Sequence, residues 1–199
     1  MTQQIILASG SQIRAQLLRN AGLAFDTVIP KVDEQSIQSS LLADGASPRE
    51  IADALAEAKA RRIAGRYPTA LVIGCDQVLS LNGQIFTKPD SQAAAIAQLQ
   101  QLSGATHTLY AAAVIYADSD PVWRHIGQVK LTMRSLSDAA IQAYVTRNWD
   151  SIQHAVGCYK IEEEGPRLFT RIDGDYFSIL GLPLLELLSY LALRGTLPA

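Results

Sequence analysis

The sequence predicts an α/β fold with a mixed sheet, and two patterns in the order of its segments support this. In the first half, short apolar segments typical of buried strands alternate with helical segments. In the middle, strand-like segments follow one another with only short polar turns between them, which favours antiparallel pairing. The 199 residues, 48% of them hydrophobic, suffice for a sizeable core, and we expect a single domain over residues 1–199.

The N-terminal segment combines a strand, a small turn and a helix. Residues 5–8 form a continuous apolar run typical of a buried strand, and Ser9-Gly10-Ser11 follows directly. Helical spacing of apolar residues begins after this turn and stops at Gly22, and residues 25–29 are expected to form a second strand. Such a strand–turn–helix arrangement commonly presents backbone N–H groups to a phosphate.

The next helix has a clearly marked start. Ser47 is expected to cap it, Pro48 fits its first position, and Glu50 completes a capping box. We expect this helix to continue to about Gly65 and to be followed by another buried strand at residues 70–74.

The dipeptide Asn82-Gly83 between apolar segments predicts a hairpin over residues 78–86. Beyond the hairpin, helical and strand-like patterns continue with brief polar interruptions. The expected segments are a helix at 91–102, strands at 108–117 and 123–133, a helix at 137–145, a strand at 167–172, and a last apolar helix from Pro183 to near Gly195.

Charge, cysteine usage and hydropathy restrict the function classes. The formal net charge of −2 argues against a general nucleic-acid-binding protein, which usually carries a basic excess. Cys75 and Cys158 show neither metal-site spacing nor a disulfide framework, which indicates a reducing, cytoplasmic setting. Glycine, proline, glutamate and serine interrupt the longest apolar stretch, 179–193, so we expect a soluble protein without a membrane span.

The polar residues that could carry chemistry each have an ordinary structural interpretation as well. Asp76 follows a buried strand at its carboxyl end, where ligands gather in open α/β sheets, but it could equally belong to a simple turn. Lys59 lies beside the apolar face of its helix, where lysines usually snorkel, and Lys88 precedes a stiffening proline. Arg14, in a first helical turn, could meet an anion or solvent. The pair Asp33-Glu34 is either solvated surface charge or, with Asp76, part of a carboxylate site that would suit Mg²⁺ or Mn²⁺.

Taken together and in this order, these features resemble the Maf family of nucleotide pyrophosphatases. Short motifs over nearly the whole chain carry the resemblance, each of them weak alone. They are Leu7-Ala8-Ser9-Gly10-Ser11 with Arg14, Val32-Asp33-Glu34, Ala56-Glu57-Ala58-Lys59-Ala60, Ile73-Gly74-Cys75-Asp76-Gln77-Val78, Thr87-Lys88-Pro89, Leu102-Ser103-Gly104 and Leu180-Gly181-Leu182-Pro183. The resemblance implies a Maf/ITPase-like α/β fold, with an elongated mixed sheet flanked by helices, two lobes with a central cleft, and a homodimeric assembly.

The resemblance also implies an activity and a division of roles. Members of this family hydrolyse the α–β phosphoanhydride bond of a nucleoside triphosphate with a divalent cation, giving a nucleoside monophosphate and pyrophosphate. The chain is therefore expected to remove modified or non-standard nucleotides, without a nucleic-acid or membrane partner. Asp76 is expected to activate water and, with Glu34, to hold Mg²⁺ or Mn²⁺. The substrate phosphates are expected to bind to Ser9, Arg14, Lys59 and Lys88.

Three positions that line the base end of the pocket in the family depart here from its usual pattern. Ile13 replaces the first arginine of the Ser-Pro-Arg-Arg opening, Gln77 replaces a frequent threonine, and Glu162 replaces a glutamine. Gln77 together with Glu162 is similar to the branch that prefers 7-methyl-GTP. A carboxylate suits guanine because it can accept from both N1–H and the exocyclic amine.

Two other functions remain open from the sequence. Maf-like proteins have been linked to inhibition of septum formation, so a nucleotide-bound regulator of cell division acting by protein contact is an alternative. Such a binding protein would not need a water-activating carboxylate at Asp76. A nucleotidyltransferase is a further alternative, although the sequence lacks a second strong acidic pair near Asp76.

Overall fold

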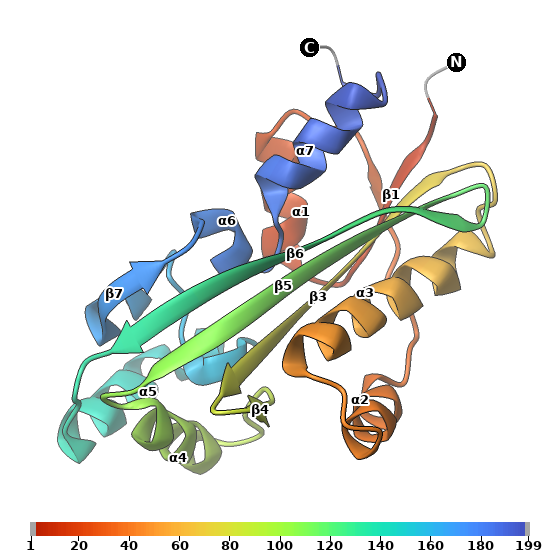
Figure 1. Cartoon of the computed structure of the whole chain (residues 1–199). Helices are drawn as coiled ribbons and strands as arrows, with labels where there is room; N and C mark the ends of the chain where they lie inside the picture. The colour runs from red at the N-terminus through yellow and green to blue at the C-terminus, as the bar shows by residue number, and fades with distance from the viewer. Residues whose placement is uncertain (1–2, 198–199) are drawn as a thin grey trace. The chain divides into compact units, whose positions relative to one another are not determined.

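The computed structural model describes residues 3–197, which form a mixed arrangement of helices and strands (Figure 1). The strands are β1 (Ile5–Ala8), β2 (Asp26–Thr27), β3 (Leu71–Leu81), β4 (Gln84–Phe86), β5 (Thr106–Ala117), β6 (Asp120–Met133) and β7 (Phe169–Asp173). The helices are α1 (Gln12–Asn20), α2 (Glu34–Ala43), α3 (Pro48–Ala64), α4 (Gln92–Leu102), α5 (Asp138–Ile152), α6 (Tyr176–Ile179) and α7 (Leu184–Leu193), with 3₁₀ turns η1 (Val156–Cys158) and η2 (Gly165–Leu168).

The strands form one mixed sheet in the order β2-β1-β3-β5-β6-β7, with β4 paired to β3. β1 pairs in parallel with both β2 and β3, whereas β3–β4 and β6–β7 are antiparallel. Asn82 and Gly83 both have positive φ in the β3–β4 turn, as the Asn-Gly hairpin signal requires. The predicted α/β class with a mixed sheet is therefore confirmed.

The described chain divides into two compact units. The first comprises residues 3–77, 110–127 and 175–197, and the second comprises residues 78–109 and 128–174. β3, β5 and β6 each contribute residues to both units. The prediction of one domain over residues 1–199 and the cleft expected from the family remain predictions.

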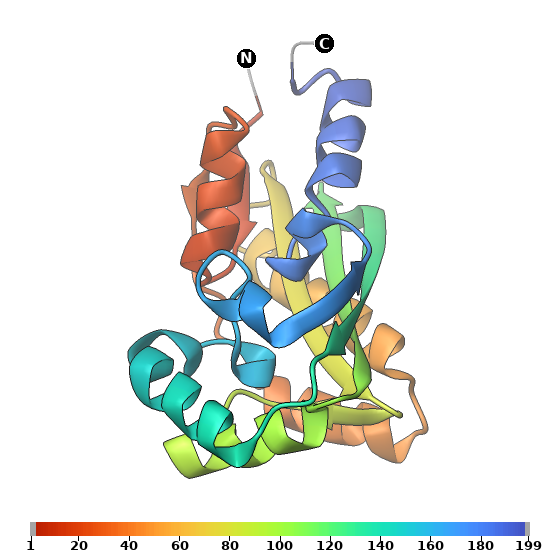
Figure 2. The ribbon, with the colours of Figure 1, turned by 90° about the vertical axis from the view of Figure 1, so that its left-hand side faces the viewer.

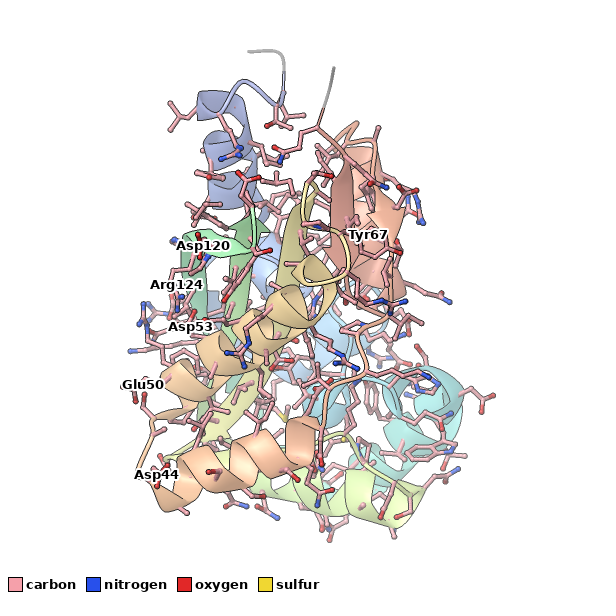
Figure 3. The ribbon with its side chains drawn as sticks, turned by 90° about the vertical axis from the view of Figure 1, so that its right-hand side faces the viewer. Asp44, Glu50, Asp53, Tyr67, Asp120 and Arg124 are labelled. Atoms are coloured by element: carbon pink, nitrogen blue, oxygen red, sulfur yellow. The ribbon has the colours of Figure 1, made fainter. Side chains whose placement is uncertain are left out.

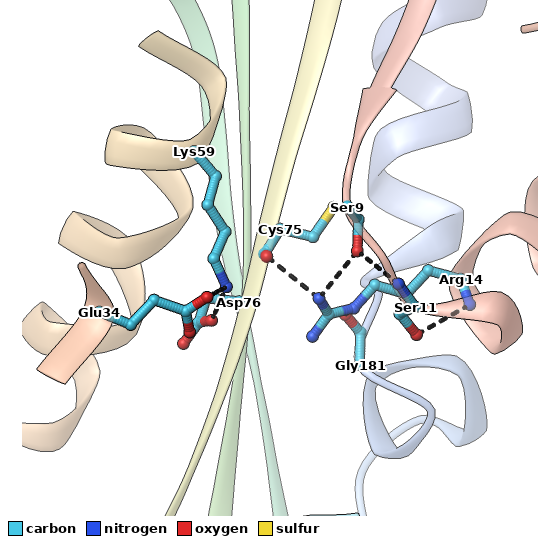
Figure 4. Close-up of polar contacts among 8 residues, drawn as sticks. All are labelled: Ser9, Ser11, Arg14, Glu34, Lys59, Cys75, Asp76 and Gly181. Carbon is cyan, nitrogen blue, oxygen red and sulfur yellow. Dashed lines mark hydrogen bonds and ion pairs between the residues drawn. The ribbon is translucent and has the colours of Figure 1, made fainter. Parts of the chain in front are cut away.

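The core of the first unit lies between the sheet and two helices that cover the same face. Leu7, Ile73 and Ile115 of β1, β3 and β5 are fully buried there, against Leu18 of α1 and Leu187 of α7. Each such side chain contributes roughly 1.5–3 kcal/mol when it is withdrawn from water. Strand alternation turns the intervening residues to the opposite face, where α3 lies (Figure 4).

α3 is held at its N-terminus by the predicted cap. Ser47 Oγ accepts from the backbone N–H of Glu50, and the Glu50 carboxylate accepts from the Ser47 backbone N–H, so the capping box is complete. Along the outer surface of α3, Arg124 of β6 donates to Asp53 and Glu57, at 2.6 and 2.9 Å. Figure 3 shows Asp53 and Arg124 side by side. This pairing fixes α3 to the sheet at its exposed edge.

Several predicted boundaries differ from the structure. The strand expected at 25–29 is reduced to Asp26–Thr27, and Phe25 just before it packs against the core. The helix expected at 137–145 continues to Ile152. α2 was not predicted: Asp33 caps it by accepting from the backbone N–H of Ser36, which also keeps the pKa of Asp33 below its usual value.

The second unit is built around α4 and α5, which pack side by side (Figure 2). Inside it, the buried His107 ring contacts Tyr159 and Phe169, and its Nε2 lies 2.8 Å from the Tyr159 hydroxyl. Burial lowers the pKa of His107 to about 4, so the ring is neutral at physiological pH. Across residues 3–197, none of the helices is long and apolar enough to cross a membrane.

Candidate functional site

Asp76 lies inside a strand rather than at the end of one. The strand expected to stop at Gly74 continues through Asp76 to Leu81 as β3, so the sequence-based placement was wrong. The parallel partner β1 does stop at this point, because its last pair is Ala8 with Gly74. Asp76 therefore lies two residues beyond the last pair with β1, where β3 continues without this neighbouring strand. A polar side chain can be accommodated at this position.

The Asp76 carboxylate is paired with a buried ammonium. Lys59 Nζ lies 2.6 Å from Asp76 Oδ1 and 3.0 Å from Glu34 Oε1. The side chains of Lys59 and Asp76 are each 9% exposed, whereas Glu34, on the first turn of α2, is 52% exposed. The structure thus brings together three of the predicted residues, from α2, α3 and β3 (Figure 4). The alternative interpretation of Lys59 as a snorkelling lysine was wrong, because its ammonium is buried against Asp76, whereas Glu34 remains half exposed to solvent while it pairs with Lys59.

Gly74 makes this approach possible. A Cβ atom at Gly74 would stand 2.6 Å from the Ala60 backbone nitrogen and would clash with the Ala56 carbonyl oxygen of α3. Because no side chain intervenes, α3 packs directly on β3 and carries Lys59 to within reach of Asp76. A glycine inside a strand is a known sign of close backbone approach, so this signal was present in the sequence.

Burial governs the protonation of Asp76. Its near-complete desolvation raises the pKa of the carboxyl, while the charges of Lys59 and Arg14 oppose that rise. A carboxylate with a raised pKa is a better proton acceptor than an exposed one. The neighbouring Cys75 thiol is also buried, which raises its pKa to about 11 and leaves it protonated and unreactive.

Arg14 is held by three acceptors on the other side of β3 (Figure 4). Its Nε donates to the Gly181 carbonyl at 2.7 Å, and its Nη1 donates to the Cys75 carbonyl at 3.1 Å and to Ser9 Oγ at 3.4 Å. Ser9 is buried, and Ser11 caps α1 by accepting from the Arg14 backbone N–H. Arg14 is therefore not the exposed helix arginine of the alternative interpretation.

The remaining predicted residues are distributed between the two units. Gln77 and the half-buried Ile13 belong to the first unit, and Ile13 packs against its core. Lys88 and Glu162 are exposed residues of the second unit, and within the described residues neither side chain forms a hydrogen bond or ion pair. The site in the first unit therefore consists of Glu34, Lys59 and Asp76 on one side of β3, and Ser9 and Arg14 on the other.

Comparison with known proteins identifies the family. Residues 4–193 match the family described as Maf-like protein. The chain belongs to the Maf family. Curated relatives named "Nucleoside triphosphate pyrophosphatase" include those of Ruegeria pomeroyi, 60% identical over 197 residues (99% of each chain), and Roseobacter denitrificans, 60% identical over 198 residues (100% of each). A protein of Brucella abortus named "7-methyl-GTP pyrophosphatase" is 46% identical over 191 residues, 96% of each chain.

The Maf site has a donor set that suits a hard divalent cation. Glu34 and Asp76 direct carboxylate oxygens at one position, that of the Lys59 ammonium. Within residues 3–197, no group of three or more His, Cys, Asp or Glu side chains is placed to hold a metal ion. Mg²⁺ commonly takes one or two carboxylates and completes its shell with water and substrate phosphates, so two carboxylates fit it.

The sequence analysis assigned no role to two groups of this Maf protein. Gly74 is the first, as described above. The second is the turn after α6, where the Gly181 carbonyl accepts from Arg14 and the carbonyls of Ser178 and Ile179 accept from the Gln77 side chain. Backbone carbonyl groups are present in every residue, so a sequence does not indicate which of them accept these bonds. Only the glycine at position 181 was a signal, because its positive φ favours glycine.

Proposed function

We propose that this chain is a nucleoside triphosphate pyrophosphatase that hydrolyses the α–β phosphoanhydride bond to give a nucleoside monophosphate and pyrophosphate. The names of relatives up to 60% identical over nearly the whole chain support the reaction. The observation that carries the proposal is the buried Asp76–Lys59 pair, with Arg14 on the opposite side of the same strand. Such a site offers a proton acceptor and cations for phosphate at once.

In the proposed reaction, Asp76 takes a proton from water, and the water oxygen forms a bond with the α-phosphorus. The bond between that phosphorus and the bridging oxygen breaks, and pyrophosphate leaves with the electron pair. General base catalysis of this kind contributes about 10²–10⁴-fold in rate. Lys59 and Arg14 are proposed to bind the phosphates and to offset the charge that grows on the leaving group, with Ser9 as an additional contact.

Glu34 and Asp76 are the proposed ligands of Mg²⁺ or Mn²⁺. When bound, the cation would supply Lewis-acid stabilisation of the phosphate oxygens. Lys59 then has two roles, because it neutralises both carboxylates and is also the cation available to a phosphate.

We further propose that Lys88 binds phosphate, that the protein acts in the cytoplasm, and that it forms a homodimer. Both cysteines are unbridged, and α7 exposes Leu185 and Leu193, which supports these last two proposals.

We propose Glu162 as the residue that reads the base, with a preference for 7-methyl-GTP. The two glutamates after it are already occupied: Glu163 accepts from Ser151 and Lys160, and Glu164 accepts from three donors on α5 and η2. The Glu162 carboxylate, which has no such partner among the described residues, can accept from the guanine N1–H and exocyclic amine. The relative from Brucella abortus, named for 7-methyl-GTP, supports this preference.

The decisive experiment measures pyrophosphate release from a panel of nucleoside triphosphates that includes 7-methyl-GTP. Mg²⁺, Mn²⁺ and a chelator are compared for the wild type, for Asp76→Asn and for Asp150→Asn, an exposed aspartate of α5 that serves as control. We expect metal-dependent release that Asp76→Asn reduces about 10²–10⁴-fold and Asp150→Asn leaves intact. Full activity of Asp76→Asn would remove its assigned role.

Base preference is tested by the same change at two adjacent positions. Glu162→Gln is expected to lower the preference for 7-methyl-GTP by about tenfold, because it removes a charged acceptor. Glu163→Gln, whose carboxylate is already paired within the loop, is expected to leave the preference unchanged. If both variants keep the wild-type profile, another residue reads the base.

The regulator of cell division is the competing function, and the comparisons do not favour it. It would gain support if the wild type bound nucleotides but released no pyrophosphate with either metal. In that case Asp76→Asn and the wild type would bind nucleotide equally well, and a protein partner would have to be sought.

A further inference from the structure

The amide nitrogen of Gln77 is fully engaged with the backbone of another element. Gln77 follows Asp76 on β3, and its Nε2 donates to the carbonyls of Ser178 and Ile179, both at 2.9 Å. A side-chain amide nitrogen has two hydrogens, so both are used. Gln77 therefore has no donor left for a ligand, and its two bonds fix the C-terminal end of α6 against β3.

The turn that follows α6 connects Gln77 to Arg14. The backbone N–H of Gly181 donates to the Ser178 carbonyl at 3.1 Å, so the carbonyl that Gln77 holds also shapes the turn. Gly181 has a φ of +92, and a Cβ atom there would stand 3.0 Å from Arg14 Nε. Its carbonyl oxygen then accepts from Arg14 Nε at 2.7 Å. One side-chain amide and one guanidinium thus hold this turn from its two ends.

The hydrogen bonds of Arg14 leave one edge of its guanidinium open. Nε is used by Gly181, and the two hydrogens of Nη1 are used by Cys75 and Ser9. Within residues 3–197, Nη2 donates to no protein group. The planar guanidinium cannot turn without breaking these bonds, so the direction in which Nη2 points depends on where the Gly181 carbonyl lies.

We infer that Gln77 is a positioning residue for Arg14: it fixes the α6–Gly181 turn, whose carbonyl orients the guanidinium with Nη2 available to a substrate phosphate. This inference rests on the proposed function for the identity of the anion. Its consequence is that loss of the Gln77 amide weakens phosphate binding for every nucleotide alike, irrespective of the base. Loss of a residue that only reads the base would instead weaken binding of one nucleotide and leave the binding of others unchanged.

The test replaces Gln77 by methionine, which keeps the length and removes both donors. The control is Gln16→Met, on Arg14's own helix, whose amide bonds only to Asn20. The first readout needs no ligand: hydrogen exchange of the Arg14 Nε–H by NMR, with the signal assigned from its loss in Arg14→Lys. We expect exchange about tenfold faster in Gln77→Met and unchanged in Gln16→Met, because the bond to Gly181 is loosened.

The second readout is binding of inorganic tripolyphosphate, which has no base. We expect Gln77→Met to weaken it about tenfold, and to cause no further loss when Arg14 is already lysine, because the two residues act through one contact. An unchanged Arg14 Nε–H signal overturns the inference, and so does additive loss in the double variant. Faster exchange without hydrolysis of any nucleotide would support the positioning role while removing the proposed enzyme function.

Discussion

Replacing Lys59 by methionine tests the central ion pair of the site. The change keeps the length of the side chain but removes the ammonium that lies 2.6 Å from Asp76 and 3.0 Å from Glu34. Asp76 is then left as a buried carboxylate without its counter-ion, and breaking a buried pair in this way costs about 3–5 kcal/mol. The contact with the exposed Glu34 adds at most about 1 kcal/mol. Against a typical total of about 5–15 kcal/mol, this loss is large.

The assay is urea unfolding in the presence of a chelator, for the wild type, Lys59→Met, Asp76→Asn and the double variant. We expect the double variant to be more stable than Lys59→Met, because an amide at position 76 needs no counter-ion. Burial raises the pKa of Asp76, so its contribution to the stability of Lys59→Met is present at low pH and is lost as pH rises from the pKa of the unfolded chain through that raised value. Purely additive losses in the double variant would refute this reasoning.

Two further predictions concern the packing around the site and the second unit. Gly74→Ala should lower the free energy of unfolding in urea by about 1–3 kcal/mol, because the added Cβ meets the α3 backbone. Gly65→Ala is the control and should cost little, because the nearest atom to its Cβ is 3.7 Å away. Equal effects of the two changes would contradict the close approach of α3 to β3. Because burial lowers the pKa of His107 to about 4, wild-type stability should fall by about 3 kcal/mol between pH 6.5 and 4, as the unfolded chain binds the proton first. His107→Phe should lack this dependence, and parallel pH curves for the two proteins would show that another group is responsible.

The parts of the fold that were predictable are those encoded by neighbouring residues. The capping box at Ser47 and Glu50 and the turn at Asn82-Gly83 involve groups at most a few positions apart, and both are present as expected. The cap at Asp33 is equally local, but α2 was not expected. No residue of this helix is buried, so its sequence lacks the apolar stripe that indicates a helix.

The site was less predictable because its stabilising contacts are distant in sequence. An aspartate within an apolar segment indicates a turn when it is read alone, and only Lys59, 17 positions earlier, makes Asp76 tolerable inside β3. The environment of Arg14 depends in the same way on Gly181, 167 positions later. Family resemblance supplied the identities of these residues, whereas their contacts had to come from the structure.

The two sides of β3 place a restriction on how this sequence can change in length. Successive residues of a strand point to opposite faces, so the loss or gain of a single residue between Gly74 and Asp76 would turn the carboxylate away from Lys59. The same shift would move the Cys75 carbonyl that receives Arg14. Only the insertion of two residues would preserve the parity, and that would displace the carboxylate along the strand by about 6.6 Å. In this stretch the count of residues is therefore as much a part of the site as their chemistry.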